Sequence, residues 1–187
     1  LSGNPPASFS TMSMSALFVD GEKEVNSDLQ LMYGNANYFD LYNLKLVAGR
    51  MPLNDSIREY VVNKAYLKVI GIENPGDVVG KNLKGDNEMF PIVGVMEDFN
   101  QHSLKYGVAP MAFTGGSYSG KWTQFRTIHF KLSSLDTSNW PKTISSVEKI
   151  WKDLYPESDF EYTFMDDTVK KFYESEQKTS ILLQWAT

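Results

Sequence analysis

The hydrophobic pattern changes its period in the last third of the chain, and this change restricts the fold more than any other feature. Residues 124–132 alternate between two faces, which is typical of a half-buried strand. Large apolar residues then recur at steps of four and three, and so share one stripe of a helix: Trp140, Ile144, Val147, Trp151 and Leu154. We expect another strand at residues 160–164 and a last helix capped by Asp166 or Asp167. This order of elements, after strand-rich segments, predicts an α+β fold.

The first two thirds of the chain favour short strands separated by turns. We expect strands at residues 16–19, 29–33, 44–47, 59–62, 81–83, 89–96 and 110–113. Asp20-Gly21 is a turn signal between the first two of these strands. Breaks in composition at Pro52 and in the glycine-rich loop 115–120 mark candidate domain boundaries.

Two short helices are expected in the same region, each preceded by an asparagine. Asn35 can cap a helix over residues 36–42, and Asn63 can cap a helix over residues 64–70. An asparagine side chain at this position accepts a backbone hydrogen bond from the first turn of the helix. Gly71 follows the second helix, where a residue in the left-handed conformation ends many helices.

The charge and the residue content exclude several classes of function. The net charge is -5, which argues against the basic surface of a nucleic-acid-binding protein. The chain has no cysteine, and this excludes disulfides, thiolate nucleophiles and cysteine-based zinc sites. No run of about 18 apolar residues occurs, so no segment of this sequence predicts a membrane span. The chain begins at Leu1 without methionine and ends as it turns apolar, and we expect it to be a fragment of a longer protein.

The sequence contains no constellation that predicts catalysis. The two histidines are His102, in a predicted turn, and His129, in a predicted strand, and no G-x-S-x-G motif accompanies them. Each histidine is expected to be paired with a neighbour or solvated. Glu97 and Asp98 are adjacent carboxylates that point to opposite faces of a strand and lack further metal ligands nearby. We therefore expect no catalytic residue, no cofactor and no metal, and we predict that the chain is not an enzyme.

Two aromatic residues have no place in the predicted core. Tyr118 and Trp122 flank the glycine-rich loop, whereas most other aromatic residues fall on predicted strands or on the helical stripe. Aromatic residues are enriched in partner interfaces, although they are more often packed inside a protein. Tyr118 and Trp122 are therefore the candidate partner-interface residues. With the acidic composition, they leave open an alternative function as a secreted or periplasmic carbohydrate- or ligand-binding module.

Five segments of the chain form an ordered pattern. They are residues 37–50, 60–66, 79–83, 91–100, and 160–167 with 173–176. The first contains a Tyr-Phe pair, an apolar strand and a Gly-Arg turn, and the fourth is an apolar strand that ends in Glu-Asp-Phe-Asn. Together they resemble the MacB-like periplasmic core domain of FtsX/MacB-type ABC transporter permeases, in the style common in Bacteroidetes. The chain departs from that pattern at its start, because the family has a further helix before this point.

The resemblance implies a particular fold. It implies a porter-like βαβ lobe formed by the two chain ends, residues 1–52 and 117–187. It also implies a smaller sabre-like α/β lobe, residues 53–116, inserted between them. The two implied boundaries agree with the breaks in composition described above.

The resemblance also implies a function. The domain would lie on the periplasmic side of the inner membrane and would couple ATP-driven motion of membrane helices to partners or substrates outside the membrane, without catalysis. Implied partners are the flanking transmembrane helices, a cytoplasmic ATPase subunit acting indirectly, and a periplasmic adaptor, an outer-membrane channel or a lipoprotein. A dimer is implied in the full permease. We expect the last helix, residues 168–187, to continue into a membrane helix and to pass on its displacement.

Overall fold

The computed structural model describes residues 1–6, 12–85, 88–101, 107–118, 122–133, 137–171 and 173–174, with the backbone alone at residues 117–118 and 122–123. The chain forms two compact units, Leu1–His129 and Phe130–Thr187. These units differ from the boundaries expected at Pro52 and at residues 115–120. The division into a porter-like and a sabre-like lobe stays a prediction.

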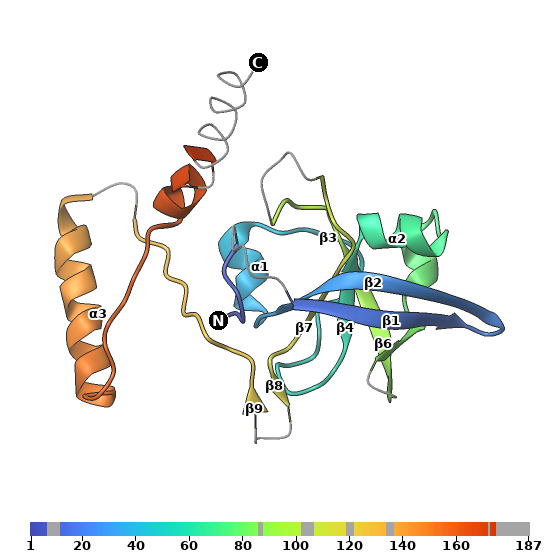
Figure 1. Ribbon diagram of the computed structural model, residues 1–187, viewed down its shortest axis with the longest axis horizontal. Helices are drawn as coiled ribbons and strands as arrows, with labels where there is room; N and C mark the ends of the chain where they lie inside the picture. The colour runs from blue at the N-terminus through green and yellow to red at the C-terminus, as the bar shows by residue number, and fades with distance from the viewer. Residues whose placement is uncertain are drawn as a thin grey trace, which may run out of the picture. The chain divides into compact units, whose positions relative to one another are not determined.

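A seven-stranded sheet organises the first unit (Figure 1). Its strands are β1 (Met12–Asp20), β2 (Lys23–Tyr33), β3 (Leu46–Gly49), β4 (Tyr60–Asn63), β5 (Asn82–Gly85), β6 (Glu88–Met96) and β7 (Met111–Thr114). Their order is β3-β6-β4-β7-β2-β1-β5, and β5 also pairs with β6, so the ladder closes on itself. The β2–β7 and β4–β6 pairs are parallel. Each strand predicted between residues 16 and 113 overlaps one of these, so strands from both sides of Pro52 share one sheet.

Local signals determine the first hairpin and the second helix. Asp20 pairs with Lys23, which leaves Gly21 in the two-residue turn with a φ of 61°. Helix α2 (Lys64–Ile70) begins after Asn63, whose side chain accepts a hydrogen bond from Tyr66 N. It ends at Gly71, which is left-handed with a φ of 67°. The predicted turn, cap and helix end are confirmed.

Helix α1 (Asn37–Tyr42) is capped differently from the prediction. Its N-cap residue is Ala36, and no side chain caps it. The Asn35 side chain instead accepts a hydrogen bond from the Leu1 nitrogen at 3.1 Å. The predicted cap by Asn35 is wrong because the helix begins at Asn37 with Ala36 at the N-cap, so Asn35 lies one residue before the capping position.

Two apolar clusters cover the two faces of the central strands. Neighbouring residues of a strand point to opposite faces. In β4, Tyr60 and Val62 join one cluster and Val61 joins the other. The first cluster includes α2 and the short 3-10 turn η1 (Pro75–Val78), and the second includes α1. Figure 1 shows α1 and α2 on either side of these strands. The sheet is therefore buried on both faces at β4, and full burial of a valine there contributes about 1.5–3 kcal/mol.

The end of β3 lies very close to the backbone of its antiparallel neighbour β6. Gly49 has a φ of 70°, and a Cβ atom added to it would lie 2.2 Å from the Val93 oxygen. Gly94 is its counterpart, since a Cβ atom there would lie 2.4 Å from the Arg50 oxygen. Glycine is needed at both positions because a side chain would collide with backbone atoms.

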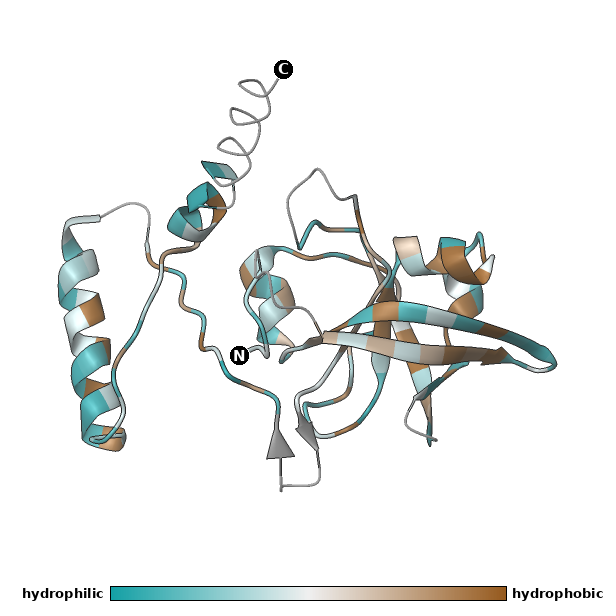
Figure 2. Cartoon of the chain, viewed as in Figure 1, coloured by the Kyte–Doolittle hydropathy of each residue, from teal (hydrophilic) through white to brown (hydrophobic). Residues whose placement is uncertain are grey.

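The second unit contains the 3-10 turn η3 (Thr137–Asn139), helix α3 (Trp140–Leu154) and a further helix at residues 165–171. The bounds of α3 agree with the predicted stripe, and hydrophobic and hydrophilic residues recur in turn along it (Figure 2). No residue of α3 is buried. Its aromatic side chains pack on the returning segment, because Trp140 stacks on Phe164 and Trp151 lies against Phe160.

Three predictions for the last third are wrong. Residues 124–132 form no ladder among the described residues beyond the single bridge between Ser2 and Thr127. Residues 160–164 likewise have no ladder partner in the part of the chain that the structure describes. The last helix begins at residue 165, with Thr168 N donating to Phe164 O at 3.2 Å. Asp166 and Asp167 therefore lie in its first turn rather than at the cap. The mixed α and β composition of the fold is confirmed.

Candidate functional site

The predicted interface residues lie in a small two-stranded ribbon. Strands β8 (Ser117–Tyr118) and β9 (Trp122–Thr123) pair antiparallel, with Tyr118 opposite Trp122. The backbone pairing continues outward, because Gln124 N donates to Gly116 O at 2.6 Å. The structure describes the backbone alone at Tyr118 and Trp122, so their role as interface residues stays a prediction.

The segment that follows this ribbon is bound to the start of the chain. Ser2 N donates to Thr127 O at 3.0 Å, and Ser2 O accepts from Arg126 N at 2.9 Å and from Thr127 N at 3.1 Å. Thr127 and His129 are partly buried, whereas Arg126 and Ile128 are exposed. The alternation expected for this segment is thus present, and its more polar face is the one that packs inward.

His129 uses both ring nitrogens in hydrogen bonds. Its Nε2 atom lies 2.6 Å from Ser2 Oγ, and its Nδ1 atom lies 2.9 Å from the Tyr42 hydroxyl. The Ser2 hydroxyl donates its one proton to the Asn4 oxygen at 3.1 Å. Ser2 Oγ therefore accepts from Nε2–H, and Nδ1 accepts from Tyr42, which assigns a neutral ring with one tautomer. His129 was expected to be paired with a neighbour or solvated, and it is paired.

Burial keeps the His129 ring neutral. Burial, and after it the positive N-terminus, lowers the pKa of His129 to about 4. The rings of Tyr38 and Tyr42 meet the imidazole edge-on, with centroids 5.7 Å and 5.6 Å away. Burial also raises the pKa of Tyr38, whose hydroxyl has no hydrogen-bond partner among the described residues. This cluster therefore carries no charge at neutral pH.

The Ser2–His129 pair has the residue types of a nucleophile and its base, but not the access that catalysis requires. Ser2 is fully buried, with no exposed surface. Its hydroxyl proton is directed at the Asn4 oxygen rather than at the imidazole. A substrate cannot reach the Ser2 oxygen, and the arrangement joins two segments of the chain instead of activating a nucleophile.

The adjacent acidic residues each serve the start of α2. The Glu97 carboxylate forms an ion pair with the Lys64 ammonium at 2.7 Å. Asp98 Oδ1 accepts a hydrogen bond from Ala65 N at 2.8 Å. The two carboxylates are thus bound to different partners, but they lie just after the end of β6 at Met96, so the expected placement on opposite faces of a strand is wrong. His102 lies outside the described residues.

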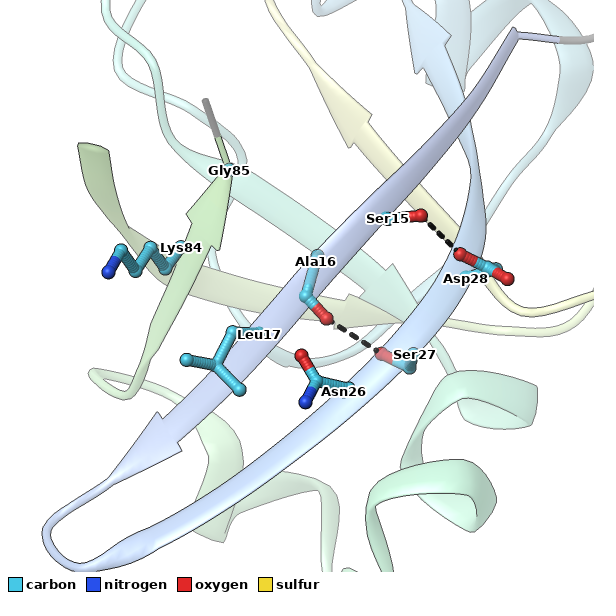
Figure 3. Close-up of a pocket in the computed structure, with 8 residues that line it drawn as sticks. All are labelled: Ser15, Ala16, Leu17, Asn26, Ser27, Asp28, Lys84 and Gly85. Carbon is cyan, nitrogen blue, oxygen red and sulfur yellow. Dashed lines mark hydrogen bonds between the residues drawn. The ribbon is translucent and has the colours of Figure 1, made fainter. Parts of the chain in front are cut away.

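A shallow depression lies on the sheet across β1, β2 and β5 (Figure 3). Leu17 lies opposite both Asn26 and Lys84 in the two ladders that it shares. Asp28 accepts a hydrogen bond from the Ser15 hydroxyl. The described residues that line the depression are mostly polar and include no aromatic side chain on which a sugar could stack. An open, polar surface of this kind does not enclose a small ligand.

Metal-binding and membrane-spanning features are absent from the described part of the chain. Among those residues, no group of three or more histidine, cysteine, aspartate or glutamate side chains could hold a metal ion. Within the same residues, no helix is long and apolar enough to cross a membrane. Of the features described above, the hydrogen bonds that hold residues 126–129 to Ser2 and Tyr42 are the candidates for a functional role.

Comparison with known proteins identifies the fold. No protein-family model and no curated protein matches the chain. The solved periplasmic region of MacB from Actinobacillus actinomycetemcomitans matches 88% of this chain and 73% of its own, with 24% identity and a TM-score of 0.54. The extracellular domain of the ABC-type transporter YknZ from Gram-positive bacteria matches 80% of this chain and 74% of its own, with 15% identity and a TM-score of 0.52. The chain therefore has the fold of the periplasmic region of MacB, as its five sequence segments led us to expect.

Proposed function

We propose that this chain is the extracytoplasmic domain of an ABC transporter permease, on the periplasmic side of the inner membrane. It couples ATP-driven motion of the membrane helices to partners or substrates outside the membrane. The observation that carries the proposal is the shared fold with the periplasmic region of MacB over 88% of the chain. The five ordered sequence segments support the same assignment.

The contacts of the polar residues support a role without catalysis. Ser2 is buried and its oxygen is out of reach of a substrate. The carboxylates of Glu97 and Asp98 are bound to Lys64 and to the first turn of α2. Ser2, Glu97 and Asp98 thus each have a structural partner, as residues of a domain that transmits movement would.

The partners follow from this placement. The transmembrane helices that flank the domain belong to the same polypeptide chain. The ATPase subunit acts on the domain from the cytoplasm, through those helices. A periplasmic adaptor, an outer-membrane channel or a lipoprotein is the partner outside the membrane, and the full permease is a dimer. Tyr118 and Trp122 are the residues that we propose for the contact with the outer partner.

Two observations on the parent protein test this proposal. Its gene should encode about 20 consecutive apolar residues close to each end of this chain, enough to span a bilayer twice. Replacement of this domain by a flexible glycine–serine linker of equal span in the reconstituted permease should leave ATP binding unchanged and abolish transport. A parent protein without such apolar segments, or normal transport without the domain, would contradict the proposal.

The aromatic contact has its own test. Trp122→Ala in the full permease should reduce capture of the outer partner, and Trp151→Ala, in the other unit, is the matched control because it removes the same side chain. A glycan array probed with the isolated domain distinguishes the alternative function. Glycan binding that Trp122→Ala abolishes would overturn the transporter assignment and support a carbohydrate-binding module.

A further inference from the structure

Residues 126–129 are the last segment of the first unit, and the second unit follows immediately at Phe130. Any movement of the second unit therefore acts first on this segment. The described bonds that hold it fall into two sets, the backbone bonds to Ser2 and the side-chain bonds of His129. These two sets hold in place the residues through which the chain passes from the first unit to the second.

The backbone bonds place the entry and the exit of the unit side by side. Ser2 and Thr127 are antiparallel partners. In an antiparallel pair, the residue before Ser2 and the residue after Thr127 lie at the same end of the pair. The chain thus enters at Leu1 and leaves towards Phe130 at one end, and a pull on either strand loads the same few hydrogen bonds.

The side-chain bonds connect this exit to the core. His129 Nδ1 accepts from the Tyr42 hydroxyl in α1, 87 residues away in the sequence. Helix α1 is anchored in the second apolar cluster, where the Phe39 ring meets the Phe113 ring of β7 edge-on with centroids 4.8 Å apart. His129 therefore links the exit of the unit to its buried core. The backbone of Ser2 links the exit to the end of β2, because Ser2 also bridges Gly34 and Gly3 N donates to Tyr33 O at 2.8 Å.

The attachment is weaker than the core beside it. Ile128, the apolar neighbour of His129, is 52% exposed and supplies little burial. Each hydrogen bond contributes little net stability, so this segment can open while the sheet stays folded. The buried Tyr38 hydroxyl beside the imidazole has no partner among the described residues, which is an unfavourable arrangement in the closed state.

We propose that His129 is a latch that holds the exit of the first unit to Ser2 and Tyr42, and that its opening uncouples the two units. With the latch closed, a displacement of the second unit reaches the sheet through α1 and through the bonds of Ser2 and Gly3 to the end of β2. With the latch open, residues 126–129 absorb the displacement. The direction of coupling rests on the proposed function, whereas the latch itself is a property of the folded chain.

The first experiment measures amide hydrogen exchange in the full chain. Tyr42→Phe removes the hydroxyl that bonds Nδ1 and keeps the ring, and Tyr162→Phe is the matched control because Tyr162 is an exposed tyrosine of the second unit. Loss of one hydrogen bond should speed exchange at Arg126 and Thr127 about tenfold, with the β4–β6 ladder unchanged. His129→Ala should speed the same amides further. Unchanged exchange at these amides, or equal acceleration in the β4–β6 ladder, would overturn the latch.

The second experiment locks the latch in the full permease. Ser2 and Thr127 exchange both backbone hydrogen bonds, so their Cα atoms are about 5.5 Å apart, within reach of a disulfide. This domain has no cysteine, so Ser2→Cys with Thr127→Cys introduces one unambiguous bond within it. His129→Ala should lower transport at least tenfold because the exit then opens, and the disulfide formed in the same variant should restore transport until a reductant breaks it, with ATP binding unchanged throughout.

The outcomes separate the latch from the proposed function. Normal transport in His129→Ala, with faster exchange in Tyr42→Phe, would overturn the coupling role of the latch. Absence of apolar segments in the parent protein would instead overturn the proposed function and leave the exchange result intact.

Discussion

Asn63 Oδ1 accepts the backbone N–H of Met111 at 2.9 Å, so the residue that caps α2 is also bonded to the first residue of β7. The same oxygen accepts Tyr66 N at 3.0 Å, and the Asn63 amide donates to Ala109 O at 2.9 Å. Asn63 is fully buried. One side chain thus fixes a helix, a strand and the segment before that strand.

Asn63→Ala should destabilise the protein by about 2–4 kcal/mol, because it leaves two buried N–H groups and one carbonyl without a partner. Urea unfolding at neutral pH measures this change. Asn26→Ala, at an exposed position of β2, is the control and should change the stability by less than about 0.5 kcal/mol. Equal effects of the two substitutions would contradict the role of Asn63.

The features that could be predicted from sequence are those determined by neighbouring residues. The turn at Gly21, the start of α2 at Asn63 and its end at Gly71 depend on side chains within a few positions. The stripe of α3 depends on spacing alone. The predicted cap at Asn35 failed because α1 starts one residue later than expected, and the Asn35 side chain instead bonds the Leu1 nitrogen, which is distant in sequence.

Pairings between distant residues could not be predicted. Residues 124–132 alternate as a strand does, but pattern alone does not supply a ladder partner. Among the described residues of this segment only Thr127 forms a bridge, to Ser2, which also bridges Gly34. The sequence indicated that His129 would be either paired or solvated. Its partners Ser2 and Tyr42 lie 127 and 87 positions away, and no periodicity connects residues at such separations.

The loop before β4 is held by an ion pair. Arg50 donates to both carboxylate oxygens of Glu59, at 2.8 Å and 2.7 Å, and Leu53 N donates to Glu59 at 2.9 Å. The pKa of Glu59 lies below its ordinary value of 4.5, mainly because the Glu59 carboxylate accepts the hydrogen bond from Arg50. The stability that this pair contributes is therefore present above pH 4.5 and is lost as the pH falls through the folded-state pKa.

Glu59→Gln should lower the melting temperature at pH 7 by about 4 °C, because it removes the charge and one of the two oxygens that bind Arg50. Melting curves from pH 7 downward measure the difference between the variant and the natural protein, which should shrink below pH 4.5. Glu22→Gln, at the exposed tip of the first hairpin, is the control. A difference that stays constant down to the lowest pH would contradict this account.

Substitution of two glycines with similar backbone angles distinguishes the cost of a left-handed conformation from the cost of a steric collision. Gly49 and Gly21 have φ angles of 70° and 61°, but only at Gly49 would a Cβ atom collide with backbone, 2.2 Å from the Val93 oxygen. Gly21→Ala should cost about 1 kcal/mol, from its left-handed conformation alone. Gly49→Ala should cost more than about 3 kcal/mol, because β3 must move away from β6. Equal costs in urea unfolding would show that the strands separate easily.

The lowered pKa of His129 predicts a loss of stability in mild acid. Its pKa is about 4 in the folded chain against an ordinary value of 6.5, so the unfolded chain binds more protons between these values. This contribution to stability is complete above pH 6.5 and declines as the pH falls towards 4. Since the ring is partly exposed, we expect a screened loss of about 1–2 kcal/mol. Urea unfolding at both pH values should show a smaller loss in His129→Gln, and an equal loss would mean that protonation of His129 does not weaken its bonds to Ser2 and Tyr42.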